Sequence, residues 1–360
     1  MTIIRLRAAG RPPRWRSTGL AVTGLSLAAL VYSGSVGTAG KQRSFGIDYT
    51  VSVDGIPTLA NTVEMWIPVP HNDPYQTISN LDVTTDIPAQ VDNRAYNAER
   101  PAYQIVNGEY GNRMLHLRLT APNLKPSLML GMQFSVKRRE HIRLGADSPM
   151  PVEDKSDKDP NMARWLESNR LVPLDEKIRD WAKEVVGVAG AKTDLEKARA
   201  IYNHIVATVK YDKSGQGWGR GDIYYACGAR RGNCTDFHAI FIGYARALGI
   251  PARFSIGLPM PKDHGQGTIL GYHCWAEFYI KGMGWIPVDA SEAAKDPSRR
   301  EYFFGAHDEN RVEFSRGRDL ILTPKQQGEP LNYFIYPYVE VDGKPYAGVK
   351  STFRYGDLKR

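Results

Sequence analysis

The chain has 360 residues and a mass of 40.3 kDa, which is more than one ordinary domain holds and favours two folded units. Apolar residues make up 42% and charged residues 24% of the chain, which excludes disorder over the whole length and a protein with several membrane spans. The net charge of +8 is concentrated at one end. Five arginines lie in the first 39 residues, and the rest has 42 basic against 39 acidic residues, so we expect no nucleic-acid partner.

Residues 1–39 predict a secretory signal and therefore an exported protein. A basic stretch ends at Arg16, and an uncharged run with an apolar centre at 20–32 follows it. The small residues Gly37 and Ala39 suit a cleavage site before the next residue. An uncleaved membrane anchor is the alternative. We expect a periplasmic or extracellular location, with no integral membrane span once the signal is cleaved.

Residues 40–145 predict an antiparallel β domain of the sandwich type. Apolar side chains alternate with polar residues or glycine at 45–53, 115–119 and 132–136, which is the pattern of half-buried strands. The next stretch, 146–160, is charged, contains proline and lacks any periodicity, so it is predicted to be a linker.

Helical spacing begins after this linker. One helix is expected from Glu176, and a second is opened by Thr193 with Glu196 three residues later, which is the signature of a capping box. A third helix fits 235–248, and strand-like runs follow it. Helices followed by strands predict an α+β domain at 161–322. The tail, 323–360, is expected to add further strands.

Cys234 is the first candidate for chemistry. It follows Gly232 and Asn233, which can turn the chain, and an apolar helix starts directly after it. A thiol at a helix N-terminus is stabilised as a thiolate by the unpaired backbone N–H groups and the helix dipole. Such a thiolate is a nucleophile, and the same N–H groups could bind an oxyanion. A buried structural cysteine is the alternative.

A base and a group to orient it are expected on a hairpin downstream. His273 opens an alternating strand, a KGMG turn follows, and the returning strand ends at Asp289. If the turn has three or five residues, Ile280 pairs with Gly284, and His273 and Asp289 lie on one face, two positions apart. An even-numbered turn would place them on opposite faces. The proposed chemistry therefore predicts the register of this hairpin.

The three segments together resemble the transglutaminase-like superfamily over about residues 165–322. GNCTDFHAIFIGYARALGIPARF is similar to the cysteine-bearing helix and following strand of that family, GYHCWAEFY to its histidine strand, and GWIPVDAS to its aspartate strand. The resemblance implies a papain-like catalytic domain in which Cys234 is the nucleophile, His273 the general base and acid, and Asp289 the group that holds the imidazole. It does not imply crosslinking, because the family includes thiol peptidases and members without an intact triad.

Other polar and aromatic side chains near these motifs have weaker interpretations. Trp218 and Trp275 are candidate substrate-binding residues, although aromatic residues at such spacing are usually part of the core. Asp236 and His238 are predicted to be helix caps or surface groups. We expect no zinc site, since the cysteine spacing is wrong and neighbouring residues of a strand point apart.

The two other cysteines, Cys227 and Cys274, could form a disulfide in an exported chain and leave Cys234 free. The sequence therefore predicts an exported thiol enzyme without a cofactor that acts on a peptide or protein amide through a thioester, preferably with hydrolysis. Amine transfer to protein glutamine is one alternative. A non-catalytic envelope scaffold with the same fold is the other.

Overall fold

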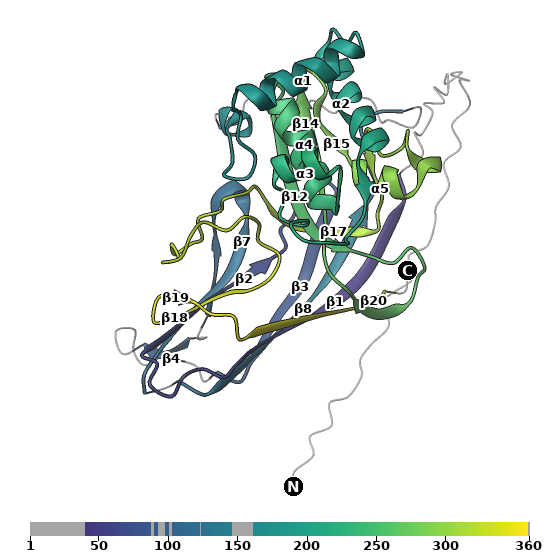
Figure 1. Cartoon of the computed structure of the whole chain (residues 1–360). Coiled ribbons are helices and arrows are strands. Elements are labelled where there is room, and N and C mark those ends of the chain that lie inside the picture. Colours follow the sequence, from purple (N-terminus) through teal and green to yellow (C-terminus); the bar gives the residue numbers. More distant parts are fainter. Residues whose placement is uncertain are drawn as a thin grey trace, which may run out of the picture. The chain divides into compact units, whose positions relative to one another are not determined.

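The computed structural model describes residues 40–87, 90–92, 98–100, 103–122, 124–145 and 161–358. The predicted signal at 1–39 and the predicted linker at 146–160 lie outside the described residues. The chain divides into two units, and the fold given below is that of the second, Gly37–Arg360 (Figure 1). Among the described residues, no helix is long and apolar enough to cross a membrane.

A five-stranded antiparallel sheet accounts for the first alternating run. Its strands, in spatial order, are β13 (Gln266–Ile269), β20 (Val349–Asp357), β1 (Gln42–Asp54), β8 (Ser127–Arg139) and β3 (Gln76–Thr85). Every second side chain of β1 from Phe45 to Val53 is at most 1% exposed. This period of two gives the sheet one apolar face, as the sequence predicts.

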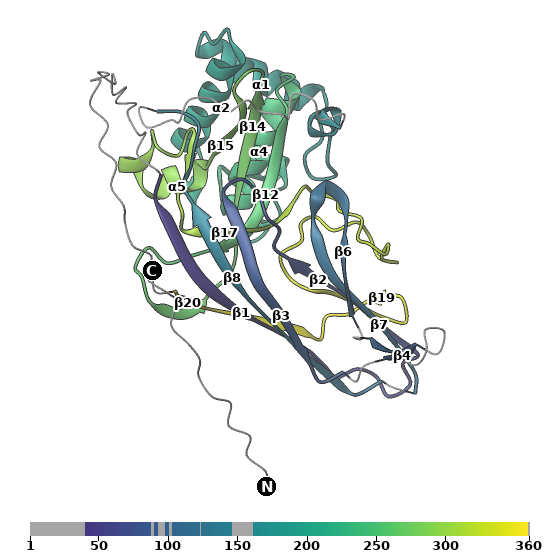
Figure 2. The same ribbon diagram turned by 180° about the vertical axis from the view of Figure 1, so that it is seen from behind.

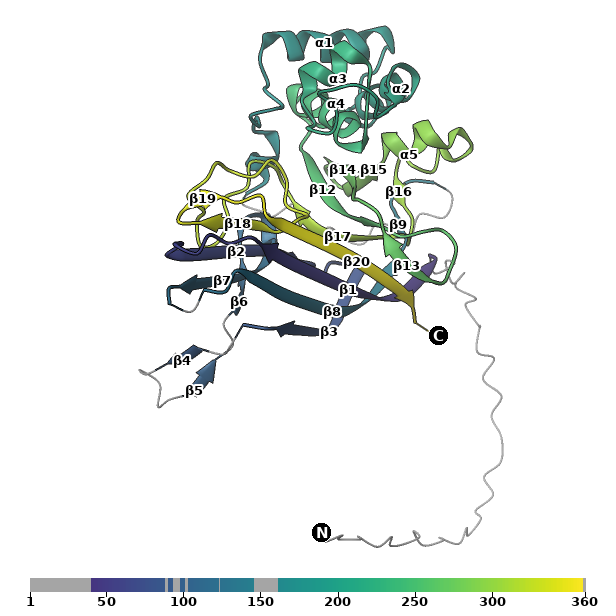
Figure 3. The ribbon, with the colours of Figure 1, turned by 60° about the horizontal axis from the view of Figure 1, so that its bottom comes forward.

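A second antiparallel sheet packs on that apolar face. Its strands are β19 (Lys344–Pro345), β18 (Tyr338–Val341), β2 (Thr62–Val69), β7 (Arg113–Thr120) and β6 (Tyr103–Asn107). Side chains of both sheets belong to one hydrophobic core, and Figure 3 shows the two layers. The predicted β-rich N-terminal domain is therefore confirmed. A small separate hairpin pairs β4 (Gln90–Asp92) with β5 (Ala98–Arg100).

The C-terminal tail forms the predicted strands and completes both sheets. β20 pairs with β1, and β18 pairs with β2. The ends of the described chain thus meet in the same two layers, an arrangement that local pattern alone does not reveal.

Among the described residues, five helices and a four-stranded sheet form most of the remaining structure. The helices are α1 (Glu176–Val188), α2 (Asp194–Thr208), α3 (Ile223–Ala229), α4 (Cys234–Ala247) and α5 (Ala290–Lys295). The three predicted helices are α1, α2 and α4. The capping box predicted at Thr193 is present, because the Thr193 hydroxyl accepts from the N–H of Glu196 and the Glu196 carboxylate accepts from that of Thr193.

The sheet carries β15 (Gly284–Val288), β14 (His273–Ile280), β12 (Ala252–Pro259) and β17 (Arg311–Arg316), all antiparallel and in that order. Helix α4 lies along β12 and β14 (Figures 1 and 2). All of its residues from Cys234 to Arg246 are buried. A helix buried on all sides can hold polar groups only where they find partners, which makes its few polar residues informative.

Short elements complete the described fold. They are β9 (His141–Ile142), which pairs with β16 (Ala306–His307), β10 (Lys210–Tyr211), which runs parallel to β11 (Arg231–Gly232), and the 3-10 turns η1 (Glu109–Gly111), η3 (Met162–Leu166) and η4 (Pro297–Arg299). The buried Gln76 of β3 connects the β layers to β17. Its amide accepts from the N–H of Glu313 at 2.8 Å and donates to the carbonyl of Glu313 at 2.9 Å. These two hydrogen bonds fix β17 against the N-terminal sheet.

Candidate active site

The start of α4 is built by a capping box that positions Cys234. The Asn233 side chain accepts from the N–H of Thr235 at 2.9 Å, and the Asp236 carboxylate accepts from the N–H of Asn233 at 2.9 Å. A Cβ atom at Gly232 would collide with this carboxylate. The local sequence therefore requires glycine before the cap and places Cys234 at the first helical position.

Asp236 also holds the glycine-rich loop in front of α3. Its carboxylate oxygens accept from the N–H of Gly219 at 2.7 Å and from that of Gly221 at 3.0 Å. The residue is completely buried. Its prediction as a cap is thus confirmed, and the structure adds a second role in tying this loop to the start of α4.

The hairpin of β14 and β15 has the register that the chemistry requires. Ile280 pairs with Gly284, which leaves a turn of three residues, and Ala276 pairs with Val288. Asp289, directly after β15, lies two positions from His273 on the same face. The Nε2 atom of His273 is 2.7 Å from Oδ2 of Asp289. The predicted register is confirmed.

The charges in this pocket favour a thiolate next to an imidazolium. Burial alone would raise the pKa of the Cys234 thiol, but hydrogen bonds from Cys274 and His273 and the charge of His273 lower it well below its usual value. Burial opposes the charged form of His273 too, yet the Asp289 carboxylate and the Cys234 sulfur raise its pKa to about 10. Because Asp289 occupies Nε2, Nδ1 is the ring nitrogen left for the sulfur.

Asp289 is held as a carboxylate by four donors. Oδ2 accepts from His273 and from the Arg311 guanidinium at 3.2 Å, while Oδ1 accepts from the Ser291 hydroxyl at 2.9 Å and from the N–H of Glu292 at 3.0 Å. Burial would raise the pKa of Asp289, but His273 and Arg311 hold it well below its usual range. The Glu292 contact also makes Asp289 the N-cap of α5.

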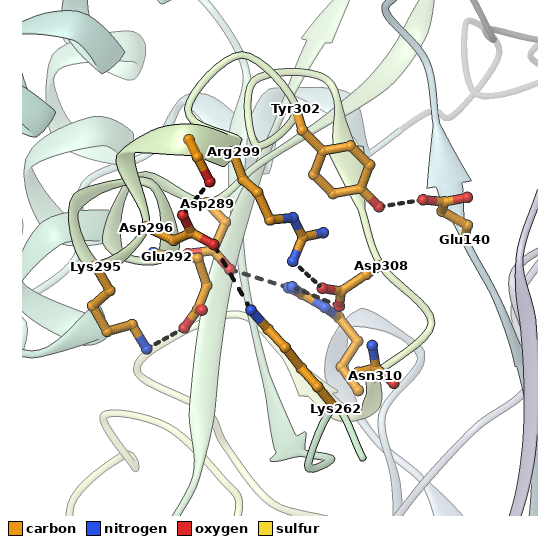
Figure 4. Close-up of polar contacts among 12 residues, drawn as sticks. Glu140, Lys262, Asp289, Glu292, Lys295, Asp296, Arg299, Tyr302, Asp308 and Asn310 are labelled. Atoms are coloured by element: carbon orange, nitrogen blue, oxygen red, sulfur yellow. Dashed lines mark hydrogen bonds and ion pairs between the residues drawn. The ribbon is translucent and has the colours of Figure 1, made fainter. Parts of the chain in front are cut away.

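Arg311 is a site residue that the sequence analysis did not identify. It is 2% exposed, and besides Asp289 it contacts Asp308 at 3.4 Å. Asp308 in turn contacts Arg299 at 3.1 Å (Figure 4). Alternating charges of this kind compensate one another in a low dielectric, so the carboxylate beside His273 is part of a buried ionic chain. No short motif surrounds Arg311, and its role depends on the pairing of β17 with β12.

Comparison with known proteins agrees with this geometry. The family model of the transglutaminase-like superfamily matches residues 179–290, the stretch that contains Cys234, His273 and Asp289. Residues 179–290 are therefore similar to a transglutaminase-like core. An uncharacterized protein of Haemophilus influenzae is 28% identical over 314 residues, which cover 78% of this chain and 81% of the relative.

A solved structure shares the fold. A candidate cysteine protease from Cytophaga hutchinsonii aligns with 89% of this chain and 92% of its own, at 16% identity and a TM-score of 0.56. This likeness extends over both the β-rich part and the transglutaminase-like core. The periplasmic domain of TgpA from Pseudomonas aeruginosa aligns with 73% of this chain and 94% of its own, at 14% identity and a TM-score of 0.35.

The two tryptophans near the transglutaminase-like motifs occupy different settings. Trp218 is partly buried in the glycine-rich loop, where its Nε1 donates to the carbonyl of Gly215 at 3.1 Å. Trp275 is 0% exposed, and the Arg311 guanidinium lies 4.9 Å from its ring centre. Trp275 therefore packs in the core against Arg311, and we do not propose it as a substrate-binding residue. It supports Arg311 instead.

His238 does not have the surface position predicted for it. It lies one turn after Cys234 on the buried face of α4 and is 0% exposed. Its Nδ1 is 3.7 Å from Sγ of Cys274, and its Nε2 is 3.6 Å from Oδ1 of Asp289. The sequence interpretation was wrong because a helix buried on every side has no surface in its first turns.

The disulfide considered between Cys227 and Cys274 is absent, and all three thiols are free. Cys227 contacts the Tyr244 hydroxyl at 3.4 Å, whereas Cys274 contacts His238. Tyr244 and His238 are six positions apart on α4, which places them roughly 120° from each other around the helix axis. The helix therefore separates the two thiols.

Among the described residues, His71, Asp73 and Glu313 form a group whose donor atoms lie within 4.8 Å of one another. Arginines already neutralise this group. Arg316 is 3.5 Å from the carboxylate of Asp73 and also pairs with Glu313, and Arg138 is 3.6 Å from Asp73. A cation would have to enter against two guanidinium groups, so this cluster fits a buried ionic contact better than a metal centre.

Proposed function

We propose that the chain is an exported cysteine peptidase or amidase that cleaves a peptide or related amide through a thioester on Cys234. The observation that carries the proposal is the 2.7 Å contact of His273 with Asp289, on the hairpin next to the cysteine-bearing helix. The contact raises the pKa of His273 above that of the neighbouring thiol. The proton therefore rests on the imidazole, and the sulfur is a thiolate before substrate arrives.

In the proposed reaction, the Cys234 sulfur forms a bond to the amide carbon, and the carbonyl oxygen becomes an oxyanion. Asn233 takes the N–H groups of Thr235 and Asp236, so we assign the N–H of Cys234 itself to the oxyanion. When the tetrahedral intermediate collapses, the C–N bond breaks and Nδ1 of His273 gives its proton to the departing amine. The acyl group stays on the sulfur as a thioester.

Water then completes the cycle. Neutral His273 accepts a proton from water, the hydroxide attacks the thioester carbon, and the C–S bond breaks to regenerate the thiolate. Asp289 carries no proton in any step. Its part is to hold the imidazole in one tautomer and to stabilise its positive charge, with Arg311 keeping the carboxylate ionised. Trp218 lies next to Gly219 in the loop that Asp236 ties to the start of α4, and it remains our proposed substrate-binding side chain.

The proposed place of action is the periplasm or the extracellular space. It is supported by the basic and then apolar pattern of residues 1–39. Cleavage would be seen as a mature N-terminus near Gly40 in protein recovered from the periplasm or the medium. Recovery of the intact chain in the membrane fraction would favour the anchored alternative.

The function is tested by incubating purified protein with a library of peptide amides and measuring the released amines by mass spectrometry. We expect release by the unchanged protein, none by Cys234→Ala, and full release by the matched control Cys227→Ser, whose thiol lies on another face of α4. A parallel set with an added primary amine separates hydrolysis from transfer. If none of the three proteins releases an amine, the non-catalytic scaffold alternative is favoured.

A further inference from the structure

The carboxylate of Asp289 lies near two imidazoles, and each imidazole has a thiol beside it. His273 contacts Oδ2 at 2.7 Å and faces Cys234, while Nε2 of His238 lies 3.6 Å from Oδ1 and its Nδ1 lies 3.7 Å from Sγ of Cys274. The proposed reaction uses the first thiol and imidazole. The second pair is equally buried, and His238 Nε2 makes no hydrogen bond among the described residues.

The second thiol lies beside the first. Cys234 and His238 are four positions apart on α4, so they share one face of the helix. Cys274 touches His238 from β14, the strand on which α4 packs. A hydrogen bond between the two thiols is also among the causes that lower the pKa of Cys234 and raise that of Cys274.

We propose that Cys274 is a resolving thiol that forms a reversible disulfide with Cys234 when a peroxide oxidises the nucleophile. The inference rests on the proposed function to the extent that Cys234 must be a thiolate. Hydrogen peroxide transfers one oxygen atom to the Cys234 thiolate and takes up a proton, which yields a sulfenic acid and water. The sulfur is oxidised and the peroxide is reduced.

The second step consumes the thiol of Cys274. His238 Nδ1 accepts its proton, the Cys274 sulfur attacks the Cys234 sulfur, and the S–O bond of the sulfenic acid breaks. The departing hydroxide recovers the proton from His238 and leaves as water. Two hydrogen atoms are thus lost overall, and a dithiol reductant returns both cysteines to thiols.

The electrostatics assign different roles to the two sulfur atoms. Burial and the neighbouring Cys234 raise the pKa of Cys274, so at rest it is a protonated thiol that does not compete as a nucleophile. The Cys274 thiol becomes a nucleophile only when a nearby base accepts its proton. His238 can be that base, because burial lowers the pKa of its imidazole and keeps it neutral. Cys227 cannot take this part, since it contacts Tyr244 on another face of α4.

The consequence is protection of the nucleophile in an oxidising compartment. A sulfenic acid without a neighbouring thiol proceeds to sulfinic acid, which ordinary thiols do not reduce. A disulfide prevents this further oxidation, and a reductant can return it to two thiols. The enzyme would therefore lose activity under peroxide and regain it with reductant.

The test treats the purified full chain with a several-fold molar excess of hydrogen peroxide, because two added oxygen atoms require two peroxide molecules, and maps the cysteines by mass spectrometry. We expect a peptide pair joined through Cys234 and Cys274 that has lost two hydrogen atoms, and its disappearance with dithiothreitol. Cys274→Ser should instead accumulate two added oxygen atoms on Cys234, unchanged by dithiothreitol. Cys227→Ser, the matched control, should behave like the unchanged protein.

Two further measurements keep the outcomes distinct. His238→Gln should slow formation of the disulfide while leaving Cys234 open to sulfenic acid, which a dimedone label detects. If Cys234 in the unchanged protein gains two oxygen atoms as fast as in Cys274→Ser, and no joined peptide appears, Cys274 is not a resolving thiol. Rapid iodoacetamide labelling of unoxidised Cys234 in the same preparation would show that the thiolate required by the proposed function is present. Slow labelling would instead contradict the proposed function.

Discussion

Removal of the imidazole beside Cys234 should change how alkylation of this thiol depends on pH. In the unchanged protein the pKa of Cys234 lies well below its usual value, mainly through the hydrogen bonds of Cys274 and His273 and the charge of His273, which outweigh burial. The thiolate is lost only when pH falls through that low pKa. In His273→Ala the hydrogen bond and charge of His273 vanish, while burial and the Cys274 hydrogen bond remain, so the pKa of Cys234 should rise toward its ordinary value.

The size of the effect follows from the thiolate fraction. A thiol with the ordinary pKa of about 8.5 is roughly 24% ionised at pH 8 and roughly 0.3% ionised at pH 6, a fall of about 75-fold. A higher pKa brings the fall closer to about 100-fold, because each unit of pH below the pKa lowers the thiolate tenfold. The unchanged protein should lose far less reactivity over this interval.

The assay is the rate of iodoacetamide labelling at Cys234, measured by peptide mass spectrometry between pH 6 and pH 8. Cys227 serves as an internal control, since burial raises the pKa of its thiol and Tyr244 only partly offsets this. Its labelling should fall steeply with decreasing pH in both proteins. A Cys234 profile in the unchanged protein as steep as that of Cys227 would refute the thiolate and imidazolium pair.

Three other substitutions address the groups that support this pair. Asp289→Asn can keep the cap of α5 but removes the charge that raises the pKa of His273, so we expect an unchanged circular dichroism spectrum and about 10²- to 10⁴-fold lower turnover; wild-type rates would remove Asp289 from the mechanism. Arg311→Met leaves two buried carboxylates without their shared cation, and urea denaturation should show a loss of about 3–5 kcal/mol in unfolding free energy. Asp236→Ala removes the acceptor of three backbone N–H groups, at a cost of about 1–3 kcal/mol, and trypsin should cut faster after Arg220 in the released loop; an unchanged cleavage rate would contradict the anchoring role.

Much of the site could be predicted because it is built from local contacts. The start of α4 depends on hydrogen bonds among Asn233, Thr235 and Asp236, all within three positions of one another. The relation of His273 to Asp289 depends on a turn of three residues. Interactions over such short separations are encoded by spacing, which a sequence displays directly.

Other contacts depend on how separate elements pack. His238 contacts Cys274 because α4 lies on β14, and Arg311 reaches Asp289 because β17 pairs with β12 beside β14. No pattern near His238 or Arg311 distinguishes them from a capping group or a surface charge. Their partners lie 36 and 22 positions away in the chain.

The amino-acid order alone therefore determined where the nucleophile sits on its helix and on which side of the hairpin its base and carboxylate meet, since short-range hydrogen bonds and turn length decide both. Only the tertiary structure decided which charges neutralise the carboxylate, which thiol neighbours the nucleophile, and which strands the C-terminal tail extends. Those choices depend on burial, because a charge or thiol removed from water takes the partner that packing brings to it.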